Sequence, residues 1–281
     1  MGRITSTAAR LLLLVAAVSS SGCDVSVGEN GFSLDISKGK AADEWVRSYT
    51  LAPGGLLEIV NANGMIDAIP ATGPRVEVRA ERTARAGSDE EARALLDAVQ
   101  MDEEVSPQRV KVSVRRSASD GGIRRLASRN GVTLRYHVRL PRGVNASFET
   151  TNGAIRLADL AGQLSATSTN GGVTGERLAG GVTASSVNGG IRLEMASVTS
   201  DVQVSITNGG VRLELPAEVK ATIDASSVNG GISVDEGLRM QATDMSRRHV
   251  AGTLNGGGPK IVATTVNGGI RISSRAALRT D

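Results

Sequence analysis

The chain has 281 residues, of which 34 are glycine and 2% are aromatic, a balance typical of β-structure built from small side chains. Its formal net charge is +3, but two of the 32 basic residues, Arg3 and Arg10, precede Cys23, where no acidic residue occurs. The chain after Cys23 is therefore close to neutral, which argues against a nucleic-acid-binding protein.

Residues 1–22 have the pattern of an export signal peptide. Basic residues precede the apolar run 11–18, which suits a signal sequence but is too short to span a bilayer. The segment ends in Ser20-Ser21-Gly22-Cys23, which resembles the lipobox of bacterial lipoproteins, although Ser20 stands where an aliphatic residue is usual. The resemblance implies that Cys23 is lipidated and becomes the new N-terminus. Ordinary signal cleavage near Ser21, leaving a free thiol, is the alternative.

Residues 23–44 are polar and glycine-bearing, as expected of a lipidated N-terminus followed by a tether. Residues 45–143 then form an N-terminal β region, because alternation of apolar and polar residues predicts strands at 46–51, 56–60, 75–80, 110–114 and 132–140. An early Asn-Gly word occurs at 63–67. Ser88 to Glu91 fits a capping box, and helical spacing after it predicts one helix at about 89–103.

An Asn-Gly word followed by a small and a β-branched residue recurs through residues 144–275, leaving 276–281 as a tail. Successive asparagines are 18 to 21 residues apart, and the interval of 38 from Asn229 to Asn267 fits two repeats of 19. Residues 236–250, rich in Met and Arg, are expected to bulge from one repeat as an insertion, where specific recognition could reside. A fixed period is the signature of a repeat architecture.

Two architectures fit these repeats: an antiparallel meander with Asn-Gly hairpins, or a parallel β-solenoid (β-helix) in which each repeat is one rung. Equivalent positions carry similar aliphatic residues, which parallel in-register stacking would align in columns, so the sequence favours the solenoid within an all-β fold. The asparagines are expected to adopt the left-handed conformation at each corner and to bond one another in an amide ladder. The ladder residues are Asn152, Asn170, Asn188, Asn208, Asn229 and Asn267.

The chain resembles the bacterial family of adhesin-like proteins with β-strand repeats, akin to the head domains of auto-transporter adhesins and largely without assigned function. The resemblance covers about residues 45–275 and rests on Leu140-Pro141-Arg142-Gly143-Val144 leading into Thr151-Asn152-Gly153, on the serial Asn-Gly words, and on the helix-bearing segment before Pro141. It implies a parallel β-solenoid in an envelope or surface protein, and it implies no reaction.

Four arginines, Arg156, Arg192, Arg212 and Arg271, occupy the fourth position after the asparagine of their repeat. In a solenoid they would form a column, interrupted by Thr174 and Ser233, that could bind phosphates or acidic polysaccharide. Glu194 and Glu214 follow on the same face and offset the charge. The sequence favours a solvated, salt-bridged face, and anion binding is the alternative.

No metal or cofactor site is indicated. Neither His137 nor His249 has a Cys, a His or paired carboxylates at metal-ligand spacing, and the calcium-binding aspartate of β-roll repeats is replaced here by Ile-Arg-Leu. Catalytic β-solenoids that act on polysaccharides usually grip sugars with aromatic rings, and the repeats after Asn152 contain none.

We therefore expect a non-enzymatic, exported lipoprotein anchored in the bacterial cell envelope, on the periplasmic or surface side, with a structural or adhesin-like binding role. Its expected partners are the membrane, through the lipid anchor, and an envelope polysaccharide or surface protein. A polysaccharide-active enzyme on a β-helix scaffold, or a binding module for anionic envelope polymers, are the alternatives.

Overall fold

A computed structural model describes residues 25–28, 31–34, 39–116 and 131–275. The predicted signal peptide, Cys23 and the tail at 276–281 lie outside these residues. Within them, the all-β prediction is confirmed, and a single α-helix accompanies the strands. No helix among the described residues is both long and apolar enough to cross a lipid bilayer.

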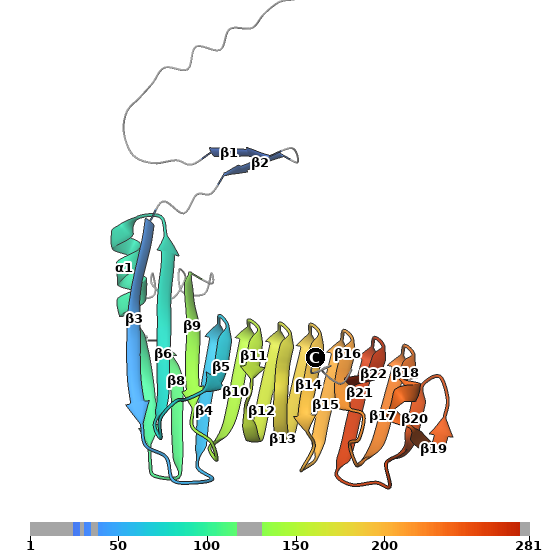
Figure 1. Ribbon diagram of the computed structural model, residues 1–281. Helices are drawn as coiled ribbons and strands as arrows, with labels where there is room; N and C mark the ends of the chain where they lie inside the picture. Colours follow the sequence, from blue (N-terminus) through green and yellow to red (C-terminus); the bar gives the residue numbers. More distant parts are fainter. Residues whose placement is uncertain (1–24, 29–30, 35–38, 117–130, 276–281) are drawn as a thin grey trace, which may run out of the picture.

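Most strands belong to one 20-stranded sheet that curls into two walls (Figure 1). Wall A contains, from β4 onward, the strands that lead into the Asn-Gly corners, and the strands within it pair in parallel. In spatial order wall A consists of β8 (Arg109–Arg116), β4 (Leu56–Asn63), β10 (Asn145–Asn152), β12 (Ala161–Asn170), the second half of β13 (Val173–Asn188), β15 (Val202–Asn208), β21 (Lys260–Asn267) and β17 (Ala221–Asn229).

Wall B contains, from β5 onward, the strands that follow the corners, and the strands within it also pair in parallel. In the same spatial order wall B consists of β9 (Val132–Leu140), β5 (Ile66–Pro70), β11 (Ile155–Ala158), the first half of β13, β14 (Ile191–Ser197), β16 (Val211–Pro216), β22 (Ile270–Arg275) and β18 (Ile232–Val234). One strand of each wall and the corner between them make one rung. The early Asn63 word forms a rung beside Asn152, so the pairing continues across residue 143.

Antiparallel strands cover both ends of the stack of rungs. At one end β7 (Val99–Val105) pairs with β8, β6 (Val76–Ala86) pairs with β9, and β3 (Gly39–Tyr49) pairs with β6. The helix α1 (Asp89–Asp97) packs against β3 and β6 at this end (Figure 1). At the other end the 3-10 turn η1 (Glu236–Leu238) leads into β19 (Met240–Met245) and β20 (His249–Leu254). A separate hairpin joins β1 (Val25–Gly28) and β2 (Gly31–Leu34).

The core is a narrow layer of aliphatic columns between the walls. One column of wall B is Ile66, Ile155, Val173, Ile191, Val211, Ile270 and Ile232, paired rung by rung. All of these residues except Ile232, on the outermost rung, are buried. Like side chains therefore stack on like, and their burial supplies the main stabilisation of a rung, because each fully buried Ile or Val contributes about 1.5–3 kcal/mol.

The helix begins where predicted but ends earlier. Ser88 caps α1 and accepts a hydrogen bond from the Glu91 N–H, while α1 ends at Asp97 instead of about 103. Val99 is buried and starts β7, in which Asp102 forms an ion pair with Arg115 of β8. The residues after Asp97 form a strand because β8 is available as a partner. The helical pattern that precedes Asp97 in the sequence gives no sign of that partner.

The predicted tether at 23–44 is also shorter than expected. Strand β3 begins at Gly39 and pairs along its whole length with β6, so residues 39–44 belong to the folded sheet. Asp43 in this segment forms an ion pair with Arg82 of β6. In this edge strand Lys40 and Glu44 are exposed, whereas Asp43 lies on the half-buried face with Ala41 and Trp45.

The chain order of the last rungs differs from the prediction of two successive repeats between Asn229 and Asn267. Strand β21 lies between β15 and β17, so the Asn267 rung is inserted between the Asn208 and Asn229 rungs. The expected insertion at 236–250 is the hairpin β19–β20, whose β20 pairs antiparallel with β17 and covers the end of wall A. A polar terminal cap protects the open edge of a repeat stack, which explains why this segment does not bulge from the middle.

The repeat asparagines do not take the left-handed conformation that the sequence suggested. Asn255 has a positive φ, but the ladder asparagines do not. Instead, the first glycine of every ladder word except Gly230 has the unusual positive φ, as at Gly209 with φ of 146°. Each ladder asparagine ends an extended strand, which holds its amide in line with the amides of the neighbouring rungs. The glycine is required twice over, since a Cβ at Gly209 would also overlap the carbonyl oxygen of Gly189.

We expect Gly209→Ala to lower the free energy of unfolding by about 2 kcal/mol or more, because the methyl group meets both an unfavourable φ and a neighbouring backbone. Gly210→Ala is the matched control, since a Cβ there lies 3.5 Å from the Gly269 carbonyl oxygen at an ordinary φ. Its effect should stay within about 1 kcal/mol. Denaturant unfolding of both variants measures the difference, and equal effects would contradict this account of the corner.

Candidate functional site

The Asn-Gly corners carry a continuous amide ladder. Each side-chain Nδ2 donates to the Oδ1 of the preceding rung at 2.8–3.0 Å. In spatial order the ladder is Asn63, Asn152, Asn170, Asn188, Asn208, Asn267 and Asn229. The structure thus joins all six asparagines expected in the ladder, adds Asn63, and exchanges the order of the last two. Because each interior amide is both donor and acceptor within the ladder, its role is structural.

A second row of hydrogen bonds lies beneath the amides, and sequence reasoning missed it. Two residues before the asparagine, a buried hydroxyl donates to the carbonyl oxygen of the first glycine on the preceding rung. The donors are Thr150, Ser168, Ser186, Thr265 and Ser227, at 2.9–3.2 Å from their acceptors. The recurring Ser or Thr at this position was the available signal, and Ile206 is its one interruption within these rungs.

The arginine column is formed by the residues that face outward from wall B after each corner. Register places Asp67, Arg156, Thr174, Arg192, Arg212, Arg271 and Ser233 side by side in that order. Insertion of the Asn267 rung therefore brings Arg271 next to Arg212, and Arg192, Arg212 and Arg271 form an unbroken set that we call the arginine triplet. Ser233 ends the column and does not interrupt it, in contrast to the sequence prediction.

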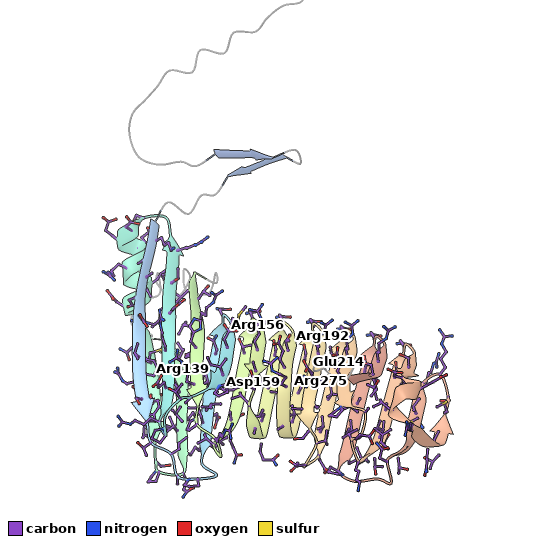
Figure 2. The ribbon with its side chains drawn as sticks, in the orientation of Figure 1. Arg139, Arg156, Asp159, Arg192, Glu214 and Arg275 are labelled. Carbon is purple, nitrogen blue, oxygen red and sulfur yellow. The ribbon has the colours of Figure 1, made fainter. Side chains whose placement is uncertain are left out.

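Charge compensation differs along this column. Arg156 lies 4.0 Å from Asp67 on the preceding rung, and Glu194 forms an ion pair at 3.1 Å with Arg275. The triplet arginines are exposed and form no ion pair within 4.0 Å with any residue that the structure describes. Figure 2 shows Arg156 and Arg192 at one level of the rungs, with Glu214 and Arg275 farther from the Asn-Gly corner. The predicted salt-bridged face therefore does not include the triplet.

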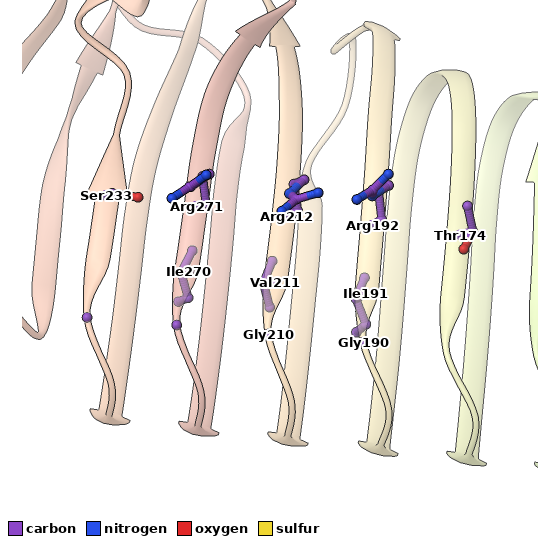
Figure 3. A pocket seen from close by; sticks show the side chains of 12 residues that line it. Thr174, Gly190, Ile191, Arg192, Gly210, Val211, Arg212, Ser233, Ile270 and Arg271 are labelled. Carbon is purple, nitrogen blue, oxygen red and sulfur yellow. The ribbon is translucent and has the colours of Figure 1, made fainter.

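A shallow groove of about 580 Å³ runs beside the triplet. Its walls include the three guanidinium groups, and the hydroxyl-bearing Thr174 and Ser233 mark its two ends (Figure 3). The second glycines of four Asn-Gly-Gly words, Gly190, Gly210, Gly269 and Gly231, line it next to the corner. No carboxylate belongs to the residues that line it. Arginine forms planar, bidentate hydrogen bonds with carboxylates and phosphates, so this is the surface of the described chain most suited to an anion.

The fold places two carboxylates beside His249. Sequence spacing gave it no carboxylate neighbours, yet the pairing of β20 with β17 and β19 places its Nδ1 2.9 Å from Asp244 and its Nε2 3.4 Å from Asp224. The hydrogen bond that His249 donates to the Asp244 carboxylate raises the pKa of His249, and Asp224 adds to this effect. Among the described residues no group of three His, Cys, Asp or Glu side chains is arranged to hold a metal ion. The contact joins the capping hairpin to wall A.

Comparison with known proteins identifies the family. The model of the family described as Toastrack DUF4097 matches residues 103–273, which is more than half of the chain. No protein of curated function matches the sequence.

Similar solved structures include a "putative cell adhesion protein" from Clostridium sporogenes, with 12% identity over 84% of this chain and 100% of that chain and a TM-score of 0.47. A "putative adhesin" from Bacteroides fragilis has 10% identity over 83% and 97% of the two chains and a TM-score of 0.39. A "putative lipid binding protein" from Parabacteroides distasonis has 10% identity over 83% and 97% and a TM-score of 0.29.

We expect Asn188→Ala to lower the free energy of unfolding by roughly 1–3 kcal/mol, because the amide donates to Asn170 and accepts from Asn208. Asn229→Ala removes only the donation to Asn267 and should cost about half as much. Thermal or denaturant unfolding of the two variants provides the comparison. A larger loss for Asn229→Ala would show that the amides do not act as one ladder.

We also expect the capping hairpin to respond to pH through His249. Its pKa is raised in the folded state, so the stabilisation is fully present below the unfolded value of about 6.5 and is lost as pH rises through the folded pKa. The free energy of unfolding of the wild type should therefore decline, relative to His249→Gln, as the pH rises from about 6.5 through the folded pKa. A constant difference between the two proteins across this interval would rule out the ion pairs as its cause.

Proposed function

Because the chain belongs to the Toastrack DUF4097 family, we propose that it is a non-enzymatic scaffold of the bacterial cell envelope that presents a repetitive surface for adhesion or binding. The scaffold is a parallel β-solenoid in which the Asn-Gly repeats are the rungs. One observation carries the proposal: neighbouring rungs pair in parallel and in register from β4 and β5 to β17 and β18. Such pairing makes a stiff body whose outer residues repeat at the strand spacing of about 4.7–4.9 Å.

The chemistry of the described residues supports binding over catalysis. Several exposed charges along the rungs are paired in salt bridges at the surface, as with Arg177 and Asp159 at 2.6 Å. The deeply buried polar side chains at the corners serve the hydroxyl row and the backbone, not a cavity. A surface of this kind can recognise a partner through shape and charge without a reacting group.

We propose further that Cys23 is acylated and holds the protein on a membrane. The support comes from the sequence, in which a basic segment and a short apolar run precede the only cysteine. Several acyl chains, each contributing about 0.8 kcal/mol per buried CH₂, would give a stable anchor. The residues between Cys23 and β3 then connect the anchor to the first rungs, so the scaffold is held close to the membrane.

We expect wild-type protein expressed in a bacterial host to incorporate a palmitate analogue and to sediment with membranes. Cys23→Ser should incorporate none and should appear in the soluble envelope fraction. In-gel fluorescence and fractionation provide the two measurements, and Ser20→Leu, which restores the usual lipobox residue, is expected to label at least as well as the wild type. An unlabelled wild type would contradict the anchor.

The non-enzymatic role is tested separately with purified mature protein. Incubation with a panel of envelope and plant polysaccharides should leave their chain lengths unchanged in size-exclusion chromatography. Release of shorter products by the wild type, and not by buffer alone, would favour the enzyme alternative instead.

A further inference from the structure

We propose that the groove beside Arg192, Arg212 and Arg271 binds an extended acidic polysaccharide that lies across successive rungs. This proposal deepens the binding role above by assigning it a surface and a ligand class. Three features of the groove point to it: the uncompensated arginines, the glycines next to them, and the free backbone donors of those glycines.

The first feature is a charge arrangement that the fold alone does not favour. Residues paired directly across neighbouring strands are about 4.5–5.5 Å apart at Cβ, and like charges in such pairs are destabilising. The triplet contains two such pairs in sequence, Arg192 with Arg212 and Arg212 with Arg271. A residue choice that costs stability without a compensating contact in the protein is typical of a functional surface, and an anion bridging the guanidinium groups would relieve the repulsion.

The second feature is the glycine that follows each Asn-Gly pair. Unlike the first glycine, Gly190, Gly210 and Gly231 are not required for steric reasons. A Cβ at Gly190 would lie 3.8 Å from the Gly210 carbonyl oxygen, one at Gly210 would lie 3.5 Å from the Gly269 carbonyl oxygen, and one at Gly231 would meet nothing within 4 Å. Ala154 occupies the equivalent position of an earlier rung, outside the groove. Because these positions carry no methyl group, a ligand can approach the backbone closely.

The third feature is a row of unused backbone donors. The carbonyl oxygens of Gly190, Gly210 and Gly269 accept hydrogen bonds from the neighbouring rungs. Their N–H groups donate to no acceptor within the described parts of the chain. Backbone N–H groups that share a concave surface are a common means of binding anionic and hydroxyl oxygens. Together with the guanidinium groups they supply donors on the three rungs that carry the arginine triplet.

The ligand class follows from this donor set. The positive groups are spaced one strand apart along a line, which suits a polymer with a repeated acidic group better than a membrane, which would contact a broad surface. Glu194 and Glu214 lie farther along the same strands and moderate the local positive charge. The Thr174 and Ser233 hydroxyls and the glycine N–H groups can hydrogen-bond sugar hydroxyls. Bases of a nucleic acid would find no aromatic ring among the groove residues.

The test uses the mature full-length protein and oligogalacturonate as the probe, with the same oligosaccharide reduced to its neutral form as the ligand control. Isothermal titration should give binding to the acidic form that weakens with added salt, and none to the neutral form. Replacing Arg192, Arg212 and Arg271 together with Gln should weaken binding by about tenfold or more, since charged hydrogen bonds are lost. Arg156→Gln is the matched control in the same column and should bind as the wild type does.

Two further variants separate the groove from general charge. Thr174→Arg places a guanidinium between Arg156 and Arg192, so the run becomes five arginines long, and binding should tighten. Gly210→Ala with Gly231→Ala adds two methyl groups to the groove and should weaken binding by severalfold. Circular dichroism should stay unchanged, and the free energy of unfolding should change by no more than about 1 kcal/mol per substitution. Gly73→Ala, at a distant open position, is the steric control.

The outcomes are decisive in either direction. Loss of binding in the triplet variant with retention in Arg156→Gln supports the proposal. Binding that is equal in all the arginine variants, absent for oligogalacturonate, or found only for polyphosphate or for phosphatidylglycerol vesicles overturns it. Such a failure would leave the scaffold role intact, because that role is judged by membrane anchoring and by the absence of polysaccharide cleavage.

Discussion

The Asn-Gly corner is the constraint on which the rest of the structure depends. At each corner the first glycine must pass its neighbour so closely that no Cβ fits, and its N–H donates to the asparagine carbonyl of the adjacent rung, as from Gly189 to Asn208. The hydrogen bonds of the amide ladder and of the buried hydroxyl row also join each rung to the adjacent rung, one strand spacing away. Three sets of hydrogen bonds thus fix one register, and a shift by one residue would break all of them and turn the aliphatic columns outward.

A register fixed in this way turns each repeat position into a column. Inside the walls the columns are aliphatic and make a narrow core, so stability comes from neighbours in the stack and little from contacts distant from it. Outside the walls, the same rule places surface residues from different repeats side by side. A single charge per repeat, unremarkable in the sequence, becomes a line of charges on the folded protein. The arginine triplet is a direct consequence of this rule.

Much of the corner could be predicted from the sequence, because its period and its Asn-Gly words are explicit. The all-β class, the start of the helix at Ser88 and the strand at 132–140 follow from short-range patterns that the fold does not override. The end of the helix could not be predicted, since Val99 starts a strand only because β8 is present beside it. The asparagine backbone was assigned wrongly because left-handed geometry is common for this residue, whereas here the glycine after it takes that geometry.

The order of the last two rungs could not be predicted from the sequence, for a different physical reason. Positions 232 and 270 are both isoleucine, so the aliphatic column is equally continuous whichever of the two rungs lies next to Val211. Only the hairpin β19–β20, which must cover an open edge with polar residues, distinguishes the two orders.

Because that hairpin follows β17 and η1, the terminal rung precedes the Asn267 rung in the chain. Strand β21, which comes later in the chain, then pairs with β15. This order has a consequence for the surface. It removes Ser233 from the interior of the arginine column, and it encloses Arg271 between two rungs that hold its strand on both sides. A strand paired on both sides holds its outward side chains in a more defined geometry than an edge strand does. The same chain reversal that closes the open edge therefore also makes the arginine triplet continuous.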